Sequence, residues 1–156
     1  MGDPKQSRKL YRKPKRPWNP EQLMNELELL GTYGLRNKRE LWKAETELSR
    51  IRHIARTLLA LPEDIRIDKA KILLAYLSRI GLADDNSTLD DILSLKIEDV
   101  LERRLQTLVM KKYELKPNQA RQMIVHRHIM INDRIVNIPG YLVRKDEEGF
   151  IKIIGK

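Results

Sequence analysis

The chain has 156 residues, of which 34% are charged, with a formal net charge of +9 and a pI near 9.8. An excess of positive charge on this scale favours an anionic partner such as a nucleic acid. The absence of cysteine excludes disulfides and thiolate metal sites, and no apolar run approaches the roughly 20 residues needed to span a bilayer. No apolar segment of a secretory signal follows the basic N-terminus, so we expect an intracellular protein.

The charge is unevenly distributed along the chain. Residues 1–18 carry seven Lys and Arg side chains against one acid, whereas residues 19–102 are net negative. Residues 103–134 carry eight Lys and Arg side chains against two acids. We therefore expect two basic binding surfaces joined by a structural middle, although charge that merely keeps the protein soluble is the simpler alternative.

Residues 1–18 are predicted to form a basic arm. The arm contains three prolines and few apolar side chains, so burial cannot offset the entropy of ordering it, and we expect it to fold only onto RNA. Tyr11 and Trp18 favour this interpretation over a tail that serves solubility, because aromatic rings stack on bases. The predicted RNA-binding residues of the arm are Lys5, Arg8, Lys9, Arg12, Lys13, Arg16 and Trp18.

Residues 19–102 are predicted to be helical. Asn19 and Pro20 are typical of a helix start, and Gly31 is the expected end of that first helix. Asn37 and Glu40 predict a capping box for a long second helix, whose inner face repeats at steps of three and four residues. That face consists of Leu41, Ala44, Leu48, Ile51, Ala55 and Leu58. On or before this helix, the predicted RNA contacts are Arg36, Lys38, Arg39 and Trp42, with a solvated charged face as the alternative.

Two further helices follow in this middle region. Pro62 ends the second helix, and the third runs from Glu63 to a stop at Gly81. Its apolar residues are Ile72, Leu73, Tyr76, Leu77 and Ile80. Thr88 with Asp91 predicts another capping box, which starts a short helix.

The C-terminal third changes from helices to strands. One helix is predicted to begin at Ile97 and to continue through Leu108, and a second begins at Pro117 and ends near Arg127. From Ile129 the apolar period becomes two, which predicts short strands over residues 129–132, 134–137, 141–143 and 150–154 with turns between them. The fold class is therefore α+β: a basic extended arm over 1–18, a mainly helical domain over 19–102, and a small domain of two to three helices and a short antiparallel sheet over 103–156.

Basic side chains are frequent in this last domain. Arg103 and Arg104 are adjacent on the predicted helix, so they cannot both face the core. If the apolar stripes pack inward, the basic groups converge on one surface, and guanidinium groups are well suited to RNA phosphates. Scattered solvated charges are the alternative. The predicted RNA-binding residues are Arg103, Arg104, Lys111, Lys112, Arg121, His126, Arg127 and Arg134.

No pattern indicates catalysis or metal binding. His126 and His128 lack a third ligand near them in sequence, and the paired acids stand at loops and helix starts. No glycine-rich phosphate loop is present, and no Ser, His and Asp arrangement stands out. We expect no enzyme activity, no metal and no cofactor.

Six segments resemble a known family. Residues 101–106 (LERRLQ), 119–126 (QARQMIVH) and 131–141 (INDRIVNIPGY) resemble the S-four RNA-binding domain. Residues 1–4 (MGDP), 35–40 (LRNKRE) and 91–95 (DILSL) are similar to the archaeal and eukaryotic branch of the small-subunit ribosomal protein S-four family. The resemblance covers essentially the whole chain.

The resemblance implies a structural constituent of the small ribosomal subunit in the cytoplasm. It implies a primary rRNA-binding protein that holds a folded junction, nucleates assembly of the subunit body and contributes to translational accuracy. The implied partners are small-subunit rRNA, ribosomal protein S five with other small-subunit proteins, and mRNA near the channel by which it enters. It also implies that Arg104, Arg121, His126, Arg127 and Arg134 face RNA.

Two departures from the family and two alternatives remain. Some bacterial relatives hold zinc through N-terminal cysteines, which this chain lacks, and relatives often extend further after the last strand. A stand-alone RNA-binding regulator or RNA chaperone could carry the same domain, but it would need neither the arm nor the helical middle. A pseudouridine synthase would need a further catalytic domain, which the helical middle does not provide.

Overall fold

The computed structural model describes residues 10–84 and 87–154 of the chain. Of the residues predicted to bind RNA, Lys5, Arg8 and Lys9 lie outside the described residues. Over the described ranges the elements are α1 (Pro20–Tyr33), α2 (Lys38–Leu59), α3 (Glu63–Ile80), α4 (Leu89–Ser94), α5 (Ile97–Glu102), α6 (Leu105–Tyr113), α7 (Pro117–Val125), β1 (Ile129–Ile131), β2 (Arg134–Ile135), α8 (Lys145–Glu148) and β3 (Ile151–Ile153). The expected α+β class is confirmed.

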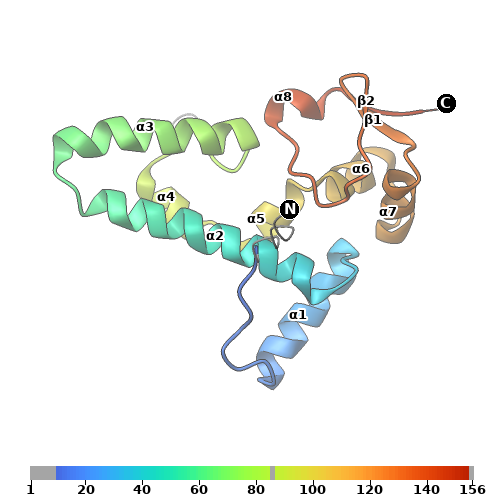
Figure 1. Ribbon diagram of the computed structural model, residues 1–156, viewed down its shortest axis with the longest axis horizontal. Helices are drawn as coiled ribbons and strands as arrows, with labels where there is room; N and C mark the ends of the chain where they lie inside the picture. The colour runs from blue at the N-terminus through green and yellow to red at the C-terminus, as the bar shows by residue number, and fades with distance from the viewer. Residues whose placement is uncertain (1–9, 85–86, 155–156) are drawn as a thin grey trace, which may run out of the picture.

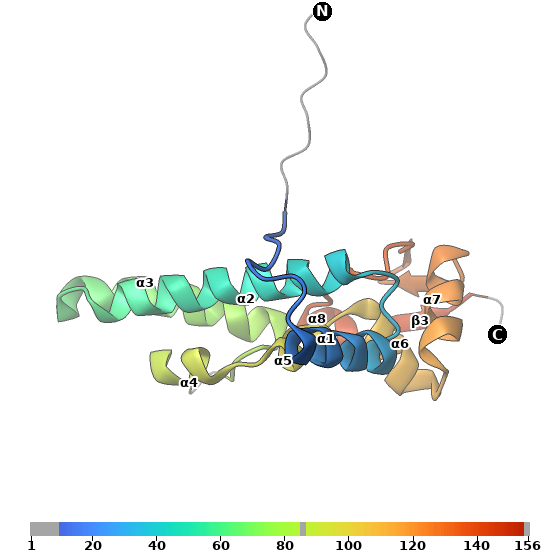
Figure 2. The same cartoon turned by 90° about the horizontal axis from the view of Figure 1, so that it is seen from below.

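The molecule is elongated, with helices at one end and the small sheet at the other (Figure 1). The long helices α2 and α3 lie side by side, and α4 and α5 pack against α2. The helices α6 and α7 pack on each other beside the sheet (Figure 2), and α1 projects from the side of α2 that faces away from α3 (Figure 1). The chain passes from the helical end to the sheet end through the short segment that links α5 to α6.

Local signals set most helix ends. The side chain of Asn37 accepts a hydrogen bond from the backbone N–H of Glu40, Thr88 and Asp91 form a capping box, and Gly81 ends α3 in the left-handed region. Gly31 does not end α1, however. The helix continues to Tyr33 and stops at Gly34, which has a φ of 59° and donates its N–H to the carbonyl oxygens of Gly31 and Leu30.

The helix predicted over residues 97–108 is broken into α5 and α6. Arg104 has extended backbone (φ −73°, ψ 142°) and forms an isolated antiparallel bridge with Leu142. The N–H of Leu105 donates to the carbonyl of Tyr141, and the N–H of Val143 donates to the carbonyl of Arg103. Residues 141–143 therefore pair with this break rather than with the sheet, and Arg103 and Arg104 do not lie on one helix as expected.

The sheet has the order β2-β1-β3, and both strand pairs are antiparallel. Asn132 and Asp133 both have positive φ, as a type I′ hairpin turn requires. The second and last strands are shorter than predicted, and the expected turn around Glu147 is the short helix α8. Ile129 and Ile131 of β1 are buried, as their alternation predicts.

Two hydrophobic clusters form the interior. The first joins α2 to α3, α4 and α5 and contains Leu35, Leu41, Ala44, Leu48, Ile51, Ala55, Leu58, Leu73, Leu77, Leu82, Ile92, Val100 and Leu101. The second joins α6 and α7 to the sheet and contains Leu105, Leu108, Val109, Ala120, Ile124, Ile129, Ile131, Val143 and Ile151. The inner face predicted for α3 is only partly correct, because Ile72 and Tyr76 are exposed. Neighbouring residues lie about 100° apart around a helix, so one packing face buries Leu73 and Leu77 but not the residues before them.

Candidate nucleic-acid interface

Two of the predicted RNA-binding arginines point into the protein. Arg104 is only 6% exposed, and its Nη2 lies 2.7 Å from Oε2 of Glu40 on α2. Arg121 on α7 donates to both carboxylate oxygens of Glu40, at 2.7 and 3.2 Å. The charges of Arg104 and Arg121 are therefore paired inside the protein, and their contact with RNA stays a prediction.

Gln106 completes this junction between the two clusters. Its side-chain amide donates to the carbonyl oxygens of Tyr33, Gly34 and Pro117, and its Oε1 accepts from Arg121. The backbones are so close here that a Cβ at Gly34 would lie 2.4 Å from Cβ of Pro117. Hydrogen bonds of this kind fix the chain between α1 and α2 against the start of α7.

The Glu40 carboxylate is stabilised in its charged form. Burial raises the pKa of this carboxyl, but the hydrogen bonds and positive charges of Arg121 and Arg104 outweigh it, so the pKa lies below its ordinary value of 4.5. Glu40 therefore carries its charge at neutral pH. Its predicted role in a capping box is wrong, because its side chain points to these two arginines instead.

Arg103 closes a second connection, on the other side of the break. Its guanidinium donates to the carbonyl oxygens of Ile80 and Val143 and forms an ion pair of 2.8 Å with Glu148. Its side chain is only 14% exposed. The guanidinium group passes so close to Gly81 that a Cβ atom at Gly81 would lie 2.9 Å from Cζ of Arg103. Arg103 therefore ties the end of α3 to α8.

The predicted lysines on α6 are exposed but engaged. Lys111 forms a 3.0 Å ion pair with Glu102, and both side chains are about half exposed. The Nζ of Lys112 donates to the carbonyl oxygens of Gly149 and Ile151. An exposed ion pair such as Lys111–Glu102 contributes little to stability, so it leaves the ammonium group of Lys111 available to an anion.

Arg127, Arg134 and His126 of this end are also exposed. Among the residues that the structure describes, neither guanidinium has an ion-pair partner. Arg127 sits directly after α7 with a φ of 64°, and Arg134 begins β2 after the tight turn. These cations are therefore free to contact phosphate.

The predicted contacts near α1 divide in the same way. Trp42 stacks on Tyr11 with ring centroids 5.9 Å apart, and its Nε1 donates to Glu26. Lys38 forms a 2.8 Å ion pair with the same carboxylate. Burial raises the pKa of Glu26, but the hydrogen bonds of Lys38 and Trp42 and the charge of Lys38 outweigh it and lower the pKa. Tyr11 and Trp42 thus pack on each other instead of offering two separate stacking surfaces.

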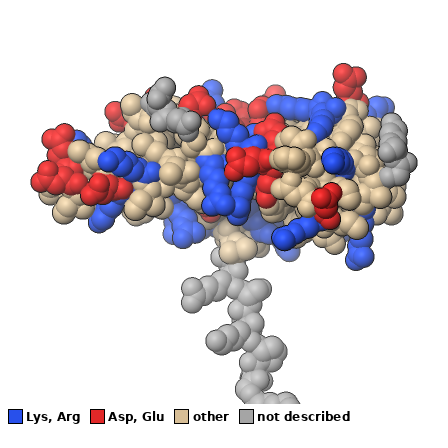
Figure 3. Space-filling view, turned by 90° about the horizontal axis from the view of Figure 1, so that it is seen from above, with Lys and Arg blue, Asp and Glu red and all other residues tan. Residues whose placement is uncertain are grey.

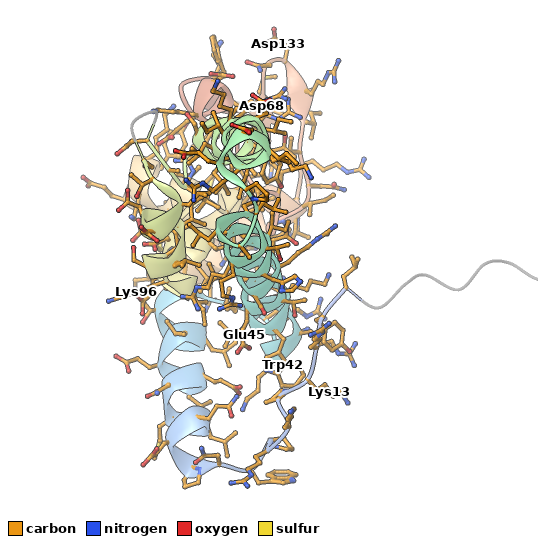
Figure 4. All side chains as sticks on the ribbon, turned by 90° about the vertical axis from the view of Figure 1, so that its left-hand side faces the viewer. Lys13, Trp42, Glu45, Asp68, Lys96 and Asp133 are labelled. Atoms are coloured by element: carbon orange, nitrogen blue, oxygen red, sulfur yellow. The ribbon has the colours of Figure 1, made fainter. Side chains whose placement is uncertain are left out.

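This stacking holds the described part of the arm on α2. Figure 4 shows the segment before α1 running along α2, with Lys13 and Trp42 labelled close together. The backbone N–H of Arg12 donates to Oγ1 of Thr46 at 3.0 Å. The predicted residues of this region that are exposed are Arg12, Lys13, Arg16, Trp18, Arg36 and Arg39. Trp18 is 86% exposed.

The charges are separated along the molecule. Acidic side chains gather at the end formed by the α2–α3 turn, where Glu63 and Asp64 lie in the first turn of α3, and Lys and Arg side chains spread across the middle (Figure 3).

A groove of about 540 Å³ lies between α2 and residues 138–142. Its polar lining includes Lys43, Arg50 and Arg104, which sequence reasoning did not bring together.

The sequence matches known proteins over nearly its full length. Residues 5–102 match the model of the ribosomal protein S4/S9 N-terminal domain, and residues 103–148 match that of the S4 domain. The chain belongs to the ribosomal protein S4 family. Small ribosomal subunit protein uS4 of Cenarchaeum symbiosum is 57% identical over 156 residues, covering 99% of this chain and 76% of the relative. The uS4 proteins of Nitrosopumilus maritimus and Hyperthermus butylicus are 58% and 55% identical over 152 residues, covering 97% of this chain and 76% and 86% of their own lengths.

Membership of the S4 family confirms the resemblance seen in the sequence. The family consists of structural ribosomal proteins rather than enzymes, and the chain is a ribosomal protein with an S4 RNA-binding domain. The two family models meet between residues 102 and 103. The boundary between the two hydrophobic clusters falls at the same place, because the first cluster ends at Leu101 and the second begins at Leu105 along the chain. The Glu40 junction therefore joins the S4 domain to the preceding N-terminal domain.

The S4 family member also lacks two kinds of feature within its described ranges. In residues 10–84 and 87–154, no group of three or more His, Cys, Asp or Glu side chains is placed to hold a metal ion. The helices of the same ranges include none that is long and apolar enough to cross a membrane. His126 and His128 stand together, with nearly parallel rings 6.4 Å apart, but the described residues place no third ligand beside them.

Proposed function

We propose that this chain is a primary rRNA-binding protein of the small ribosomal subunit. It holds a folded junction of small-subunit rRNA and nucleates assembly of the subunit body. It contacts RNA through the exposed cations that flank the Glu40 junction, with Arg127 and Arg134 on one side and Arg36 and Arg39 on the other. The basic arm adds further phosphate contacts.

The observation that carries this proposal is the locked junction between the two domains, each of which bears exposed cations. Glu40, Arg104 and Arg121 form ion pairs of 2.7 Å, and Gln106 binds three backbone carbonyls beside them. Because these contacts fix the two ends relative to each other, the free cations have fixed spacing. Cations at fixed spacing recognise the shape of a folded RNA, whereas phosphate contacts on a flexible chain would not distinguish one RNA from another.

Further partners are part of the proposal. In the cytoplasmic ribosome the chain lies beside ribosomal protein S five and near the channel by which mRNA enters, and it contributes to translational accuracy. Membership of the S4 family supports these partners.

A salt-titrated binding assay tests the proposal. The full chain is bound to small-subunit rRNA with large-subunit rRNA as competitor, and the logarithm of the binding constant is followed against the logarithm of salt concentration. Tight binding that survives the competitor supports recognition of a folded small-subunit junction. Equal and steeply salt-dependent binding to both RNAs would reduce the chain to a general RNA-binding module of the kind a stand-alone regulator uses.

A further inference from the structure

A pocket of about 400 Å³ lies along one face of α7, within the size range of small-molecule sites. Its lining residues are Leu115, Gln119, Gln122, Met123, His126 and His128. We infer that this pocket receives one unpaired, unstacked base of the bound RNA. The inference rests on the proposed rRNA binding and adds a base contact to the phosphate contacts described above.

The walls of the pocket present flat and apolar surfaces. The rings of His126 and His128 are nearly parallel, with 7° between their planes, and their centroids are 6.4 Å apart. Leu115 and Met123 supply the aliphatic part of the lining. Splayed-out RNA bases are bound by stacking on such rings, and histidine is among the side chains that do so.

The polar groups of the pocket are amides that remain available for hydrogen bonds. Oε1 of Gln119 accepts from the backbone N–H of Lys116 at 3.2 Å, which leaves its amide N–H groups to donate. No hydrogen bond is made by the Gln122 side chain within residues 10–84 and 87–154. An amide both donates and accepts, so it can pair with the edge of a base. The lining contains no carboxylate and no Lys or Arg, so it suits a neutral base better than a phosphate group.

A free cation stands beside the pocket. Arg127 lies between the two histidines, is exposed, and is held in the left-handed region at φ 64°. The backbone N–H groups of His126, Arg127 and His128 donate to the carbonyl oxygens of Gln122, Ile124 and Met123, respectively. These bonds fix the loop against α7, so the guanidinium is placed to hold the phosphate of the same nucleotide whose base enters the pocket.

Pairwise coupling between protein and RNA tests this inference. Each unpaired nucleotide of a small-subunit rRNA fragment bound by the full chain is replaced in turn by an abasic nucleotide. The dissociation constant is then measured for the wild type, Gln122→Ala and His126→Ala. We expect one abasic position to weaken wild-type binding by roughly 5- to 100-fold, the usual contribution of a stacked base. The same RNA change should have little further effect on His126→Ala.

His53→Ala is the matched control, because His53 is also an exposed histidine but lies on α2, outside the pocket. It should keep the full response to the abasic position. Circular dichroism verifies that all variants are folded, as expected for exposed side chains. If every abasic position acts additively with His126→Ala while specific binding persists, the pocket takes no base and the inference is wrong. Loss of specific binding by the wild type would instead refute the proposed function itself.

Discussion

The carboxylate of Glu40 is predicted to be the main electrostatic link between the two domains. Glu40→Gln keeps the shape of the side chain but removes its charge, so Arg104 and Arg121 lose their anion. The loss should cost more free energy at Arg104 than at Arg121. Arg104 is buried, and its Nη1 already lacks a hydrogen-bond partner in the described structure. The variant therefore leaves a buried cation unpaired.

The size of the effect follows from the burial of the group. Breaking a fully buried ion pair by removing one partner costs about 3–5 kcal/mol. The Glu40 side chain is 20% exposed, and the new amide oxygen still accepts one hydrogen bond, so the expected loss of unfolding free energy is about 2–4 kcal/mol. For a chain of this size that loss lowers Tm by roughly 5–15 °C.

Urea unfolding followed by circular dichroism measures this loss. Glu45→Gln is the matched control, because Glu45 is an exposed glutamate on the same helix (Figure 4). Burial and the nearby charge of Glu26 raise the pKa of Glu45, so neutralising it should change the unfolding free energy by no more than about 0.5 kcal/mol. If Glu40→Gln is as stable as Glu45→Gln, the junction contributes nothing and the reasoning is refuted.

Three other predictions concern pH, backbone and RNA. The pKa of Glu40 is lowered on folding, so its contribution to the unfolding free energy is complete above its ordinary pKa of 4.5 and is lost as the pH falls through the lower pKa of the folded state. Over this acidic range the unfolding free energy of the wild type should fall more steeply than that of Glu40→Gln. Parallel pH profiles would contradict this. In a thermal melt, Gly34→Ala should destabilise the fold by about 1–3 kcal/mol, because φ is 59° and the new Cβ atom would collide with Pro117. Gly31→Ala should instead stabilise α1 by about 0.5–1 kcal/mol, because no atom lies within 4 Å of the new Cβ. Equal effects at the two glycines would exclude the collision. Arg127→Ala should reduce the slope of log K against log salt for rRNA binding by about 1, and an unchanged slope would show that Arg127 touches no phosphate.

Local chemistry determined much of the fold. Asn37, Thr88 and Gly81 set helix ends through hydrogen bonds and backbone conformations that involve only neighbouring residues. The apolar spacing of α2 identified its buried face, and the alternation at Ile129 and Ile131 identified the strand. These features could be read from the sequence because their causes lie within a few residues.

Long-range contacts decided where the helices stop and which faces are buried. The break between α5 and α6 depends on the pairing of Arg104 with Leu142, which lies far along the chain. The apolar pattern of α3 fits two neighbouring faces, and only packing against α2 shows that Leu73 is buried while Ile72 is exposed. Gly34 rather than Gly31 ends α1, because the chain must turn there to meet Pro117.

The basic residues show most clearly what the sequence determined and what the tertiary structure decided. Composition and family motifs identified an RNA-binding protein and named the arginines of its S4 domain. A cation requires an anion, but residue type does not say whether the anion is a phosphate or a carboxylate of the same chain. Arg104 and Arg121 meet Glu40 across 64 and 81 residues, so only the tertiary structure could assign them to the junction and leave Arg127 and Arg134 open to RNA.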